Sequence, residues 1–278
     1  MSSIQRTHHV TTTDGVTIAA TVHGEGSPLV LLHGADNDGD LGWQEVRPHL
    51  TDRFSCHLLD NRGRGLSGDH PDLSIPRLAQ DVLEYVDSIG EPAGLVGDSL
   101  GANLALLVAA QSDAVDAIVC FEPTMMHLLD EGEEAVLSHA VAGLAEQAEQ
   151  GDLPAAVRSF LAWPFNDDEL ASAEQAGYLE AAGRYVPNLL NLLQQAMESD
   201  GPAIDHAAML GAICVPALVV SGAETRPFFA TSARFVADHA PNARVHEIPG
   251  AAHAAPMTHP EVFAAAVTGF FESVRQPA

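Results

Sequence analysis

Seven short apolar runs alternate with helical patterns along most of the chain. Each run is rich in β-forming residues and is bounded by Gly, Pro, Asn or Asp, as strands are. The runs span residues 16–24, 28–34, 54–60, 93–98, 116–122, 215–223 and 243–250. The clearest helical patterns lie at 75–89, 99–111 and 261–275. Continuous apolar strands that alternate with helices predict a parallel sheet covered on both faces, and therefore an α/β fold.

Residues 124–211 break this alternation, because they show helical patterns and no strand. This stretch is strongly acidic, with fifteen Asp and Glu residues against Arg158 and Arg184. An all-helical insertion between two strands of a parallel sheet indicates a cap over the carboxyl edge of the strands, where such sheets bind ligands. We therefore expect a helical cap domain at 124–211 and a core domain formed by 1–123 and 212–278. Five aromatic side chains of the insertion are candidates for either cap core or pocket wall: Phe160, Trp163, Phe165, Tyr178 and Tyr185.

Charge and composition exclude several classes of partner. The 278 residues contain 38 acidic and 12 basic side chains, a net charge of −26, and no lysine. This balance argues against binding to nucleic acid or to anionic membrane surfaces. No apolar run approaches the roughly 20 residues that span a bilayer. We expect a small-molecule substrate, and the sequence gives no oligomeric state.

The three cysteines and the first residues bear on the compartment. Cys56, Cys120 and Cys214 are odd in number and widely spaced, so neither a disulfide framework nor a zinc site is expected. The first fifteen residues lack the apolar segment of a secretory signal. These features favour a cytoplasmic protein.

The segment Gly97-Asp98-Ser99-Leu100-Gly101 has the pattern G-x-S-x-G between a strand and a helix. In this context the serine lies on a sharp strand-to-helix turn and is exposed above the sheet. We expect a glycine at both ends because a Cβ there would collide with the neighbouring strand or helix. The N-terminus of the helix that follows can stabilise a developing oxyanion. The pattern therefore predicts that Ser99 is a nucleophile.

With these motifs the chain resembles the α/β-hydrolase superfamily over essentially its whole length. The resemblance implies a mostly parallel, eight-stranded sheet with helices on both faces and an inserted helical cap. It also implies that Ala35, after His33-Gly34, and Leu100 supply the two oxyanion N–H groups. The segment Gly250-Ala251-Ala252-His253 resembles the loop that carries the catalytic base, so His253 is the expected base.

The catalytic acid departs from the common pattern. Thr225 occupies the position after the cap where an Asp is usual. Two other carboxyl groups could orient the base: Glu224, next to that position, and Glu122, at the end of the strand after the nucleophile helix. Some α/β-hydrolases, such as the fungal zearalenone lactone hydrolases, place the acid at that strand end, and their surrounding segments look similar. We favour Glu122 over Glu224, because an otherwise apolar strand that ends in Glu needs a partner for its charge.

Four further residues are candidates for contact with substrate: His33, Asp36, Trp163 and Arg226. Asp36, Asp38 and Asp40 form a D-x-D-x-D pattern beside the expected oxyanion hole. The pattern lacks the terminal Glu of a calcium loop, so we interpret it as a polar active-site loop and expect no metal.

Together these features predict a serine hydrolase that acts without a cofactor on a carboxylic ester or lactone. The acidic cap favours a neutral, largely apolar substrate. Two alternatives remain open at this point. The same fold and triad serve C–C bond hydrolases of β-diketone-like substrates, and a ligand-binding protein can keep the triad with little turnover.

Overall fold

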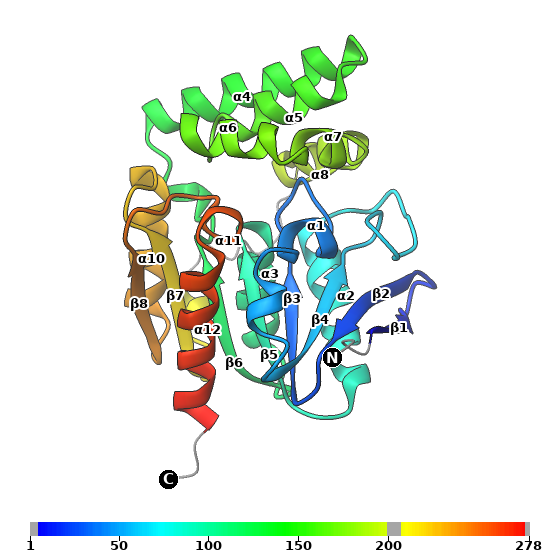
Figure 1. The fold of residues 1–278 in the computed structure, drawn as a ribbon, viewed down its shortest axis with the longest axis vertical. Helices are drawn as coiled ribbons and strands as arrows, with labels where there is room; N and C mark the ends of the chain where they lie inside the picture. The colour runs from blue at the N-terminus through cyan, green and yellow to red at the C-terminus, as the bar shows by residue number, and fades with distance from the viewer. Residues whose placement is uncertain (1–4, 199–206, 276–278) are drawn as a thin grey trace.

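A single eight-stranded sheet forms the centre of the molecule in the computed structural model, which describes residues 5–198 and 207–275 (Figure 1). The strand order is β1-β2-β4-β3-β5-β6-β7-β8, with β2 antiparallel to both of its neighbours and all other neighbouring pairs parallel. The strands are β1 (Gln5–Thr11), β2 (Thr17–His23), β3 (Ser27–Leu32), β4 (Phe54–Asp60), β5 (Ala93–Asp98), β6 (Val115–Phe121), β7 (Ala217–Gly222) and β8 (Ala243–Ile248). The expected mostly parallel, eight-stranded sheet is confirmed.

Strand β1 is the one strand that the apolar runs did not locate. Its sequence, QRTHHVT, is polar, and most of its residues are exposed. It lies at the edge of the sheet and pairs only with β2. An edge strand with little buried surface needs no apolar run, so its pattern resembles that of a loop.

Helices cover both faces of the sheet, as the alternation predicted. Side chains of β3 alternate between the two layers: Val30 and Leu32 belong to one buried cluster, and Leu29 and Leu31 to the other. The first cluster includes α2 (Ile75–Ile89), α3 (Leu100–Ala109) and α10 (Pro227–His239). The second includes α1 (Gly39–Trp43), α11 (Ala255–Thr258) and α12 (Pro260–Arg275), and η1 (Arg47–His49) lies beside α12. Within the described ranges, no helix is both long and apolar enough to cross a membrane.

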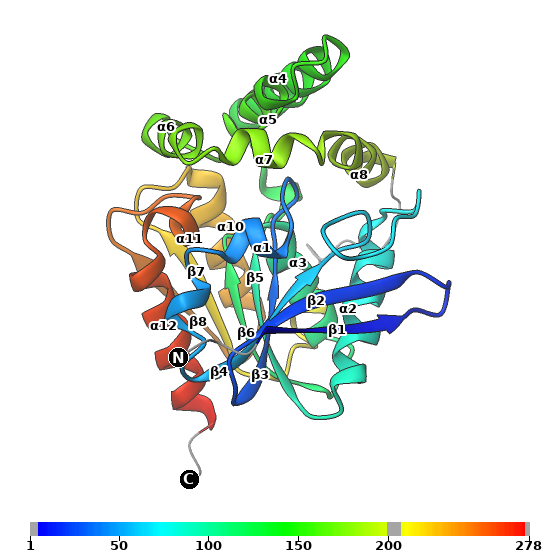
Figure 2. The ribbon, with the colours of Figure 1, turned by 45° about the vertical axis from the view of Figure 1, so that its right-hand side comes forward.

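Between β6 and β7, the described residues form helices and no strand. They are η2 (Met126–Leu128), α4 (Glu131–Glu149), α5 (Leu153–Leu161), α6 (Asp167–Gln175), α7 (Tyr178–Gly183), α8 (Val186–Glu198) and α9 (Ala207–Leu210). Figures 1 and 2 show α4–α8, here called the cap helices, as a layer over one end of the sheet. They share a buried cluster that includes Leu144, Val157 and Leu189. Residues 199–206 of the expected cap lie outside the described residues, and the division into two domains stays a prediction.

Candidate active site

Ser99 lies on the tight turn between β5 and α3. Its backbone has φ 53° and ψ −110°, a strained conformation for a residue with a Cβ. Its N–H donates to the carbonyl of Phe121 at 2.9 Å. A Cβ on Gly97 would lie 2.2 Å from the carbonyl oxygen of Gly101, and a Cβ on Gly101 would lie 2.0 Å from that of Leu32. The turn therefore requires both glycines, as the motif predicted.

Glu122 follows β6 and is completely buried. It is the only other non-glycine residue with positive φ in the described ranges, at 45°. Its Oε1 accepts from the N–H of Gly222 at 2.8 Å. Its Oε2 accepts from Thr225 Oγ1 at 2.9 Å and lies 2.5 Å from Nδ1 of His253. Three donors thus surround this buried carboxyl group, as burial of a polar group requires.

The structure brings Glu122, and not Glu224, against His253. The side chain of Glu224 is exposed, while its backbone N–H donates to the carbonyl of Ala251. Thr225, in the position where the family usually has Asp, donates its hydroxyl hydrogen bond to Glu122. The hydroxyl therefore supports the carboxyl group instead of replacing it.

His253 lies in the loop after β8 and is buried against aromatic rings, with the Phe229 ring centroid 4.2 Å away. Because a carboxylate only accepts, its contact with Glu122 places the ring proton on Nδ1 and leaves Nε2 free to accept a proton. Burial lowers the pKa of His253, but the hydrogen bond and charge of Glu122 and the charges of Asp98 and Glu169 outweigh it. The net pKa lies above its usual value of 6.5.

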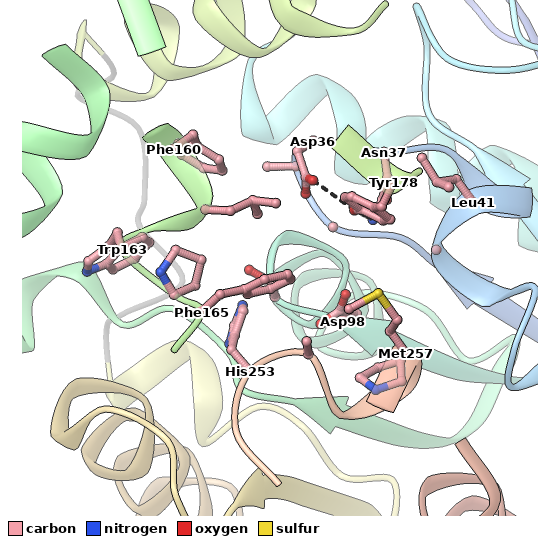
Figure 3. Close-up of a pocket in the computed structure, with 18 residues that line it drawn as sticks. Asp36, Asn37, Leu41, Asp98, Phe160, Trp163, Phe165, Tyr178, His253 and Met257 are labelled. Carbon is pink, nitrogen blue, oxygen red and sulfur yellow. Dashed lines mark hydrogen bonds between the residues drawn. The ribbon is translucent and has the colours of Figure 1, made fainter. Parts of the chain in front are cut away.

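Ser99 and His253 line one pocket between the sheet and the cap helices (Figure 3). The core supplies the loops after β3, β5 and β8, and the cap supplies apolar side chains from α5 to α7. Asp36 and Trp163, two of the expected substrate contacts, are lining residues. The aromatic residues of the wall are Phe160, Trp163, Phe165 and Tyr178.

The other two expected substrate contacts, His33 and Arg226, do not line this pocket. His33 is buried with Nδ1 2.7 Å from the carbonyl of Gly34, and its Nε2 accepts from the N–H of Asn61 at 3.1 Å. Burial lowers the pKa of His33 to about 4, so the ring is neutral and joins the ends of β3 and β4. Arg226 donates from Nε to Glu133 of α4 at 2.9 Å. The structure thus gives both side chains protein partners and brings neither into the pocket of Ser99, and their contact with substrate stays a prediction.

Ala35 lies in the loop that follows β3 and lines the pocket. Its carbonyl accepts from Nη2 of Arg64 at 2.7 Å. On the next residue, Asp36 Oδ2 accepts from the hydroxyl of Tyr178 at 2.8 Å. Leu100 begins α3, and the first N–H groups of a helix have no partner within the helix. These two backbone segments can present donors to an oxyanion.

The three aspartates of the D-x-D-x-D pattern bind different protein donors. Asp38 caps α1 by accepting from the N–H of Leu41, and it also accepts from Tyr185 and Arg184 of the cap. Asp40 is exposed and lies 3.7 Å from Arg47. Together with the bond from Tyr178 to Asp36, these contacts tie the loop to the cap. In the described part of the chain, no group of three His, Cys, Asp or Glu residues has the arrangement of a metal site.

Three polar residues of the site were not singled out from the sequence: Asn37, which lines the pocket, Glu169 and Asp98. Glu169, in the cap helix α6, accepts from the N–H of Ala254 at 2.7 Å and so fixes the residue after His253. Asp98 lines the pocket directly before Ser99. The position of Asp98 inside the G-x-S-x-G motif was the available signal, since the motif itself places it beside the nucleophile.

The α/β-hydrolase fold model matches residues 27–260, which include strands β3 to β8 and the cap helices. The chain therefore belongs to the α/β-hydrolase family.

Known relatives of the chain are hydrolases. It is 28% identical over 256 residues to a pimeloyl-[acyl-carrier protein] methyl ester esterase of Chromobacterium violaceum, covering 90% of this chain and 96% of the relative. It is 26% identical to a 2-(acetamidomethylene)succinate hydrolase of Mesorhizobium japonicum, covering 93% and 92%. An α/β-hydrolase structure from Sphaerobacter thermophilus superposes with a TM-score of 0.75 at 27% identity, covering 95% of this chain and all of the other. These likenesses support hydrolase activity.

Proposed function

We propose that this protein hydrolyses a carboxylic ester or lactone through an acyl-enzyme on Ser99. The observation that carries the proposal is the buried contact between His253 Nδ1 and Glu122 at the edge of the pocket that Ser99 also lines. In this arrangement Glu122 orients His253, and His253 takes the proton of Ser99 as its oxygen attacks the carbonyl carbon.

The proposed steps balance without a cofactor. Attack by Ser99 forms a tetrahedral oxyanion that the N–H groups of Ala35 and Leu100 stabilise. The protonated His253 then gives its proton to the leaving alkoxide, and the alcohol departs. In the second half, His253 takes a proton from water, whose oxygen attacks the acyl-enzyme. The acid is released, and the proton returns to Ser99.

The substrate that fits best is neutral and largely apolar. Aromatic side chains from the cap form one wall of the pocket, and they offer apolar area to the part of the substrate that does not react. The acidic residues on the core side are Asp36 and Asp98, and no Lys or Arg is among the described residues that line the pocket. Carboxyl groups in the pocket and on the cap disfavour an anion. The pimeloyl relative is likewise named for a methyl ester substrate.

A diester and its own half-hydrolysed product test this proposal directly. We expect the purified protein to convert dimethyl succinate to monomethyl succinate. We expect kcat/KM for the monoester anion to be lower by about 10-fold or more at low salt, because acidic groups in and above the pocket repel it. The measurement is methanol release at several ionic strengths. Added salt should reduce the difference in kcat/KM between the diester and the monoester anion.

Three results would contradict the proposal in separate ways. Faster turnover of the monoester would exclude the neutral substrate class while leaving ester hydrolysis intact. Absence of turnover for methyl and p-nitrophenyl esters, with cleavage of a β-diketone, would instead favour a C–C hydrolase. A single stoichiometric burst without steady turnover would favour a ligand-binding protein.

A further inference from the structure

Two residues of the Ser99 pocket carry a buried side-chain oxygen atom without a close hydrogen-bond partner among the described residues. These atoms are Asp98 Oδ1 and Asn37 Oδ1. Both residues line the pocket, and Asn37 is only 4% exposed. The Asn37 side chain also lies near enough to His33 to raise the pKa of that ring, so Asp98 is the residue with the clearer unmet need for a donor. A buried acceptor without a donor is destabilising, so such an atom on a residue that lines a pocket indicates a place for a ligand donor.

The side chains that carry these two atoms lie, together with Asp36, in one patch around Gly34. A Cβ on Gly34 would lie 3.4 Å from Asp98 Oδ2, 3.6 Å from Asp36 Oδ1 and 3.7 Å from Asn37 Nδ2. Gly34 precedes Ala35, and Asp98 precedes Ser99, so the patch adjoins both the nucleophile and the proposed oxyanion donor. Figure 3 shows Asp36, Asn37 and Asp98 on the core side of the cavity, across from Phe160 and Trp163. The patch therefore faces the part of a substrate that lies next to its scissile carbonyl.

The donors that the protein brings to this patch are already used. The Tyr178 hydroxyl donates to Asp36 Oδ2 at 2.8 Å, and Asn37 Nδ2 donates to that hydroxyl at 2.7 Å. Burial is the main cause that raises the pKa of Asp98 to about 7; the charge of His253 opposes this shift, and the charges of Asp36 and Glu122 add to it. The carboxyl group of Asp98 thus lacks the stabilising partner that the other carboxyl groups of the site possess.

We propose that Asp98, with Asn37, binds a hydrogen-bond donor of the substrate, such as a hydroxyl or ammonium group on a carbon close to the scissile carbonyl. This inference rests on the proposed ester hydrolysis and names the substrate class within it. A hydroxyl group supplies the missing donor without the negative charge that the pocket disfavours. Its binding would also fix the acyl chain against the core wall and leave the apolar remainder to the cap.

Three methyl esters that differ at one position test the inference. Methyl β-hydroxybutyrate carries a donor, methyl isovalerate has a methyl group in its place, and methyl β-methoxybutyrate keeps the oxygen but loses the donor. We expect kcat/KM for the better enantiomer of the hydroxy ester to exceed both others by about 10-fold or more. Assays at about pH 9 keep Asp98 ionised and hence an acceptor only, since its pKa is about 7.

The ratio of hydroxy ester to isovalerate is then measured in Asp98→Ala and Asp98→Asn. We expect the ratio to fall to near one in Asp98→Ala and to fall at least threefold in Asp98→Asn, with KM for the hydroxy ester rising most. Asp98→Asn keeps the size of the side chain and serves if the alanine variant fails to fold. Asp238→Asn, at an exposed position in α10, is the matched control and should keep the wild-type ratio.

Equal kcat/KM for all three esters in the wild type would overturn this inference and leave the proposed function standing. An unchanged ratio of kcat/KM between hydroxy ester and isovalerate in both folded Asp98 variants would also overturn the inference and leave the proposed function standing. Absence of hydrolysis for all three esters, together with inertness toward p-nitrophenyl esters, would instead remove the proposed function and this inference with it.

Discussion

Ser99→Ala should lower kcat by a factor of order 10³ or more, because the acyl-enzyme cannot form without the hydroxyl oxygen. The fold should be retained, since alanine fits the turn that φ 53° imposes no worse than serine does. Activity that survives would come from the oxyanion donors and from binding alone. The measurement is steady-state turnover of the best ester substrate, with circular dichroism to show that the variant is folded.

Ser172→Ala is the matched control for this variant. Ser172 is exposed on the cap helix α6, and its hydroxyl bonds only to a backbone carbonyl of that helix. We expect wild-type turnover from it. Near-normal turnover by Ser99→Ala, purified free of wild-type protein, would exclude the serine mechanism.

Glu122→Gln should cost on the order of 10⁴ in kcat, because glutamine keeps the size of the side chain but cannot stabilise the imidazolium of His253. Its amide can also select the wrong tautomer of the ring. Glu224→Gln is the matched control and should cost less than about 10-fold, because that side chain is exposed and Glu122 already holds His253. An inactive Glu224→Gln beside an active Glu122→Gln would move the acid to the segment after the cap.

The pH profile gives a second readout of the same substitution. His253 acts as a base only when neutral, so activity should rise with pH through its pKa, which lies above 6.5 in the wild type. Since Glu122 raises that pKa, the residual activity of Glu122→Gln should reach its plateau at a lower pH.

Adding Thr225→Asp to Glu122→Gln should restore part of the turnover that Glu122→Gln loses. The new carboxyl group would stand close to the place of the Glu122 carboxyl group, because Oγ1 of Thr225 lies 2.9 Å from Glu122 Oε2.

Much of the fold could be predicted because burial leaves a periodic pattern in the sequence. Strands β2 to β7 are mostly buried, and each coincides with an apolar run to within about two residues. The two edge strands, β1 and β8, are mostly exposed. The sequence of β8, ARVHEI, still alternates apolar and polar residues at its start, whereas QRTHHVT of β1 is almost entirely polar and carries no such pattern. The cap helices were located, but which of their aromatic residues line the pocket depends on how the helices pack.

The residues of the site likewise differ in how far the sequence alone could identify them. Ser99 and His253 stand in local motifs that the backbone geometry requires, so the sequence alone places them. The choice between Glu122 and Glu224 depends on which carboxyl group reaches a loop 131 residues along the chain from Glu122. The partner of Arg226 could not be read from the sequence either, because Glu133 lies 93 residues away in the chain. Such pairings appear only once the chain is folded.

The central claim is that Ser99 forms a covalent acyl-enzyme, and active-site labelling tests it most directly. The protein is treated with a fluorophosphonate, digested, and mapped by mass spectrometry, with Ser99→Ala treated in parallel. We expect one adduct per chain, located on Ser99 and absent from the variant, and slower labelling in Glu122→Gln. An adduct on another residue, or equal labelling of wild type and Ser99→Ala, would contradict the account.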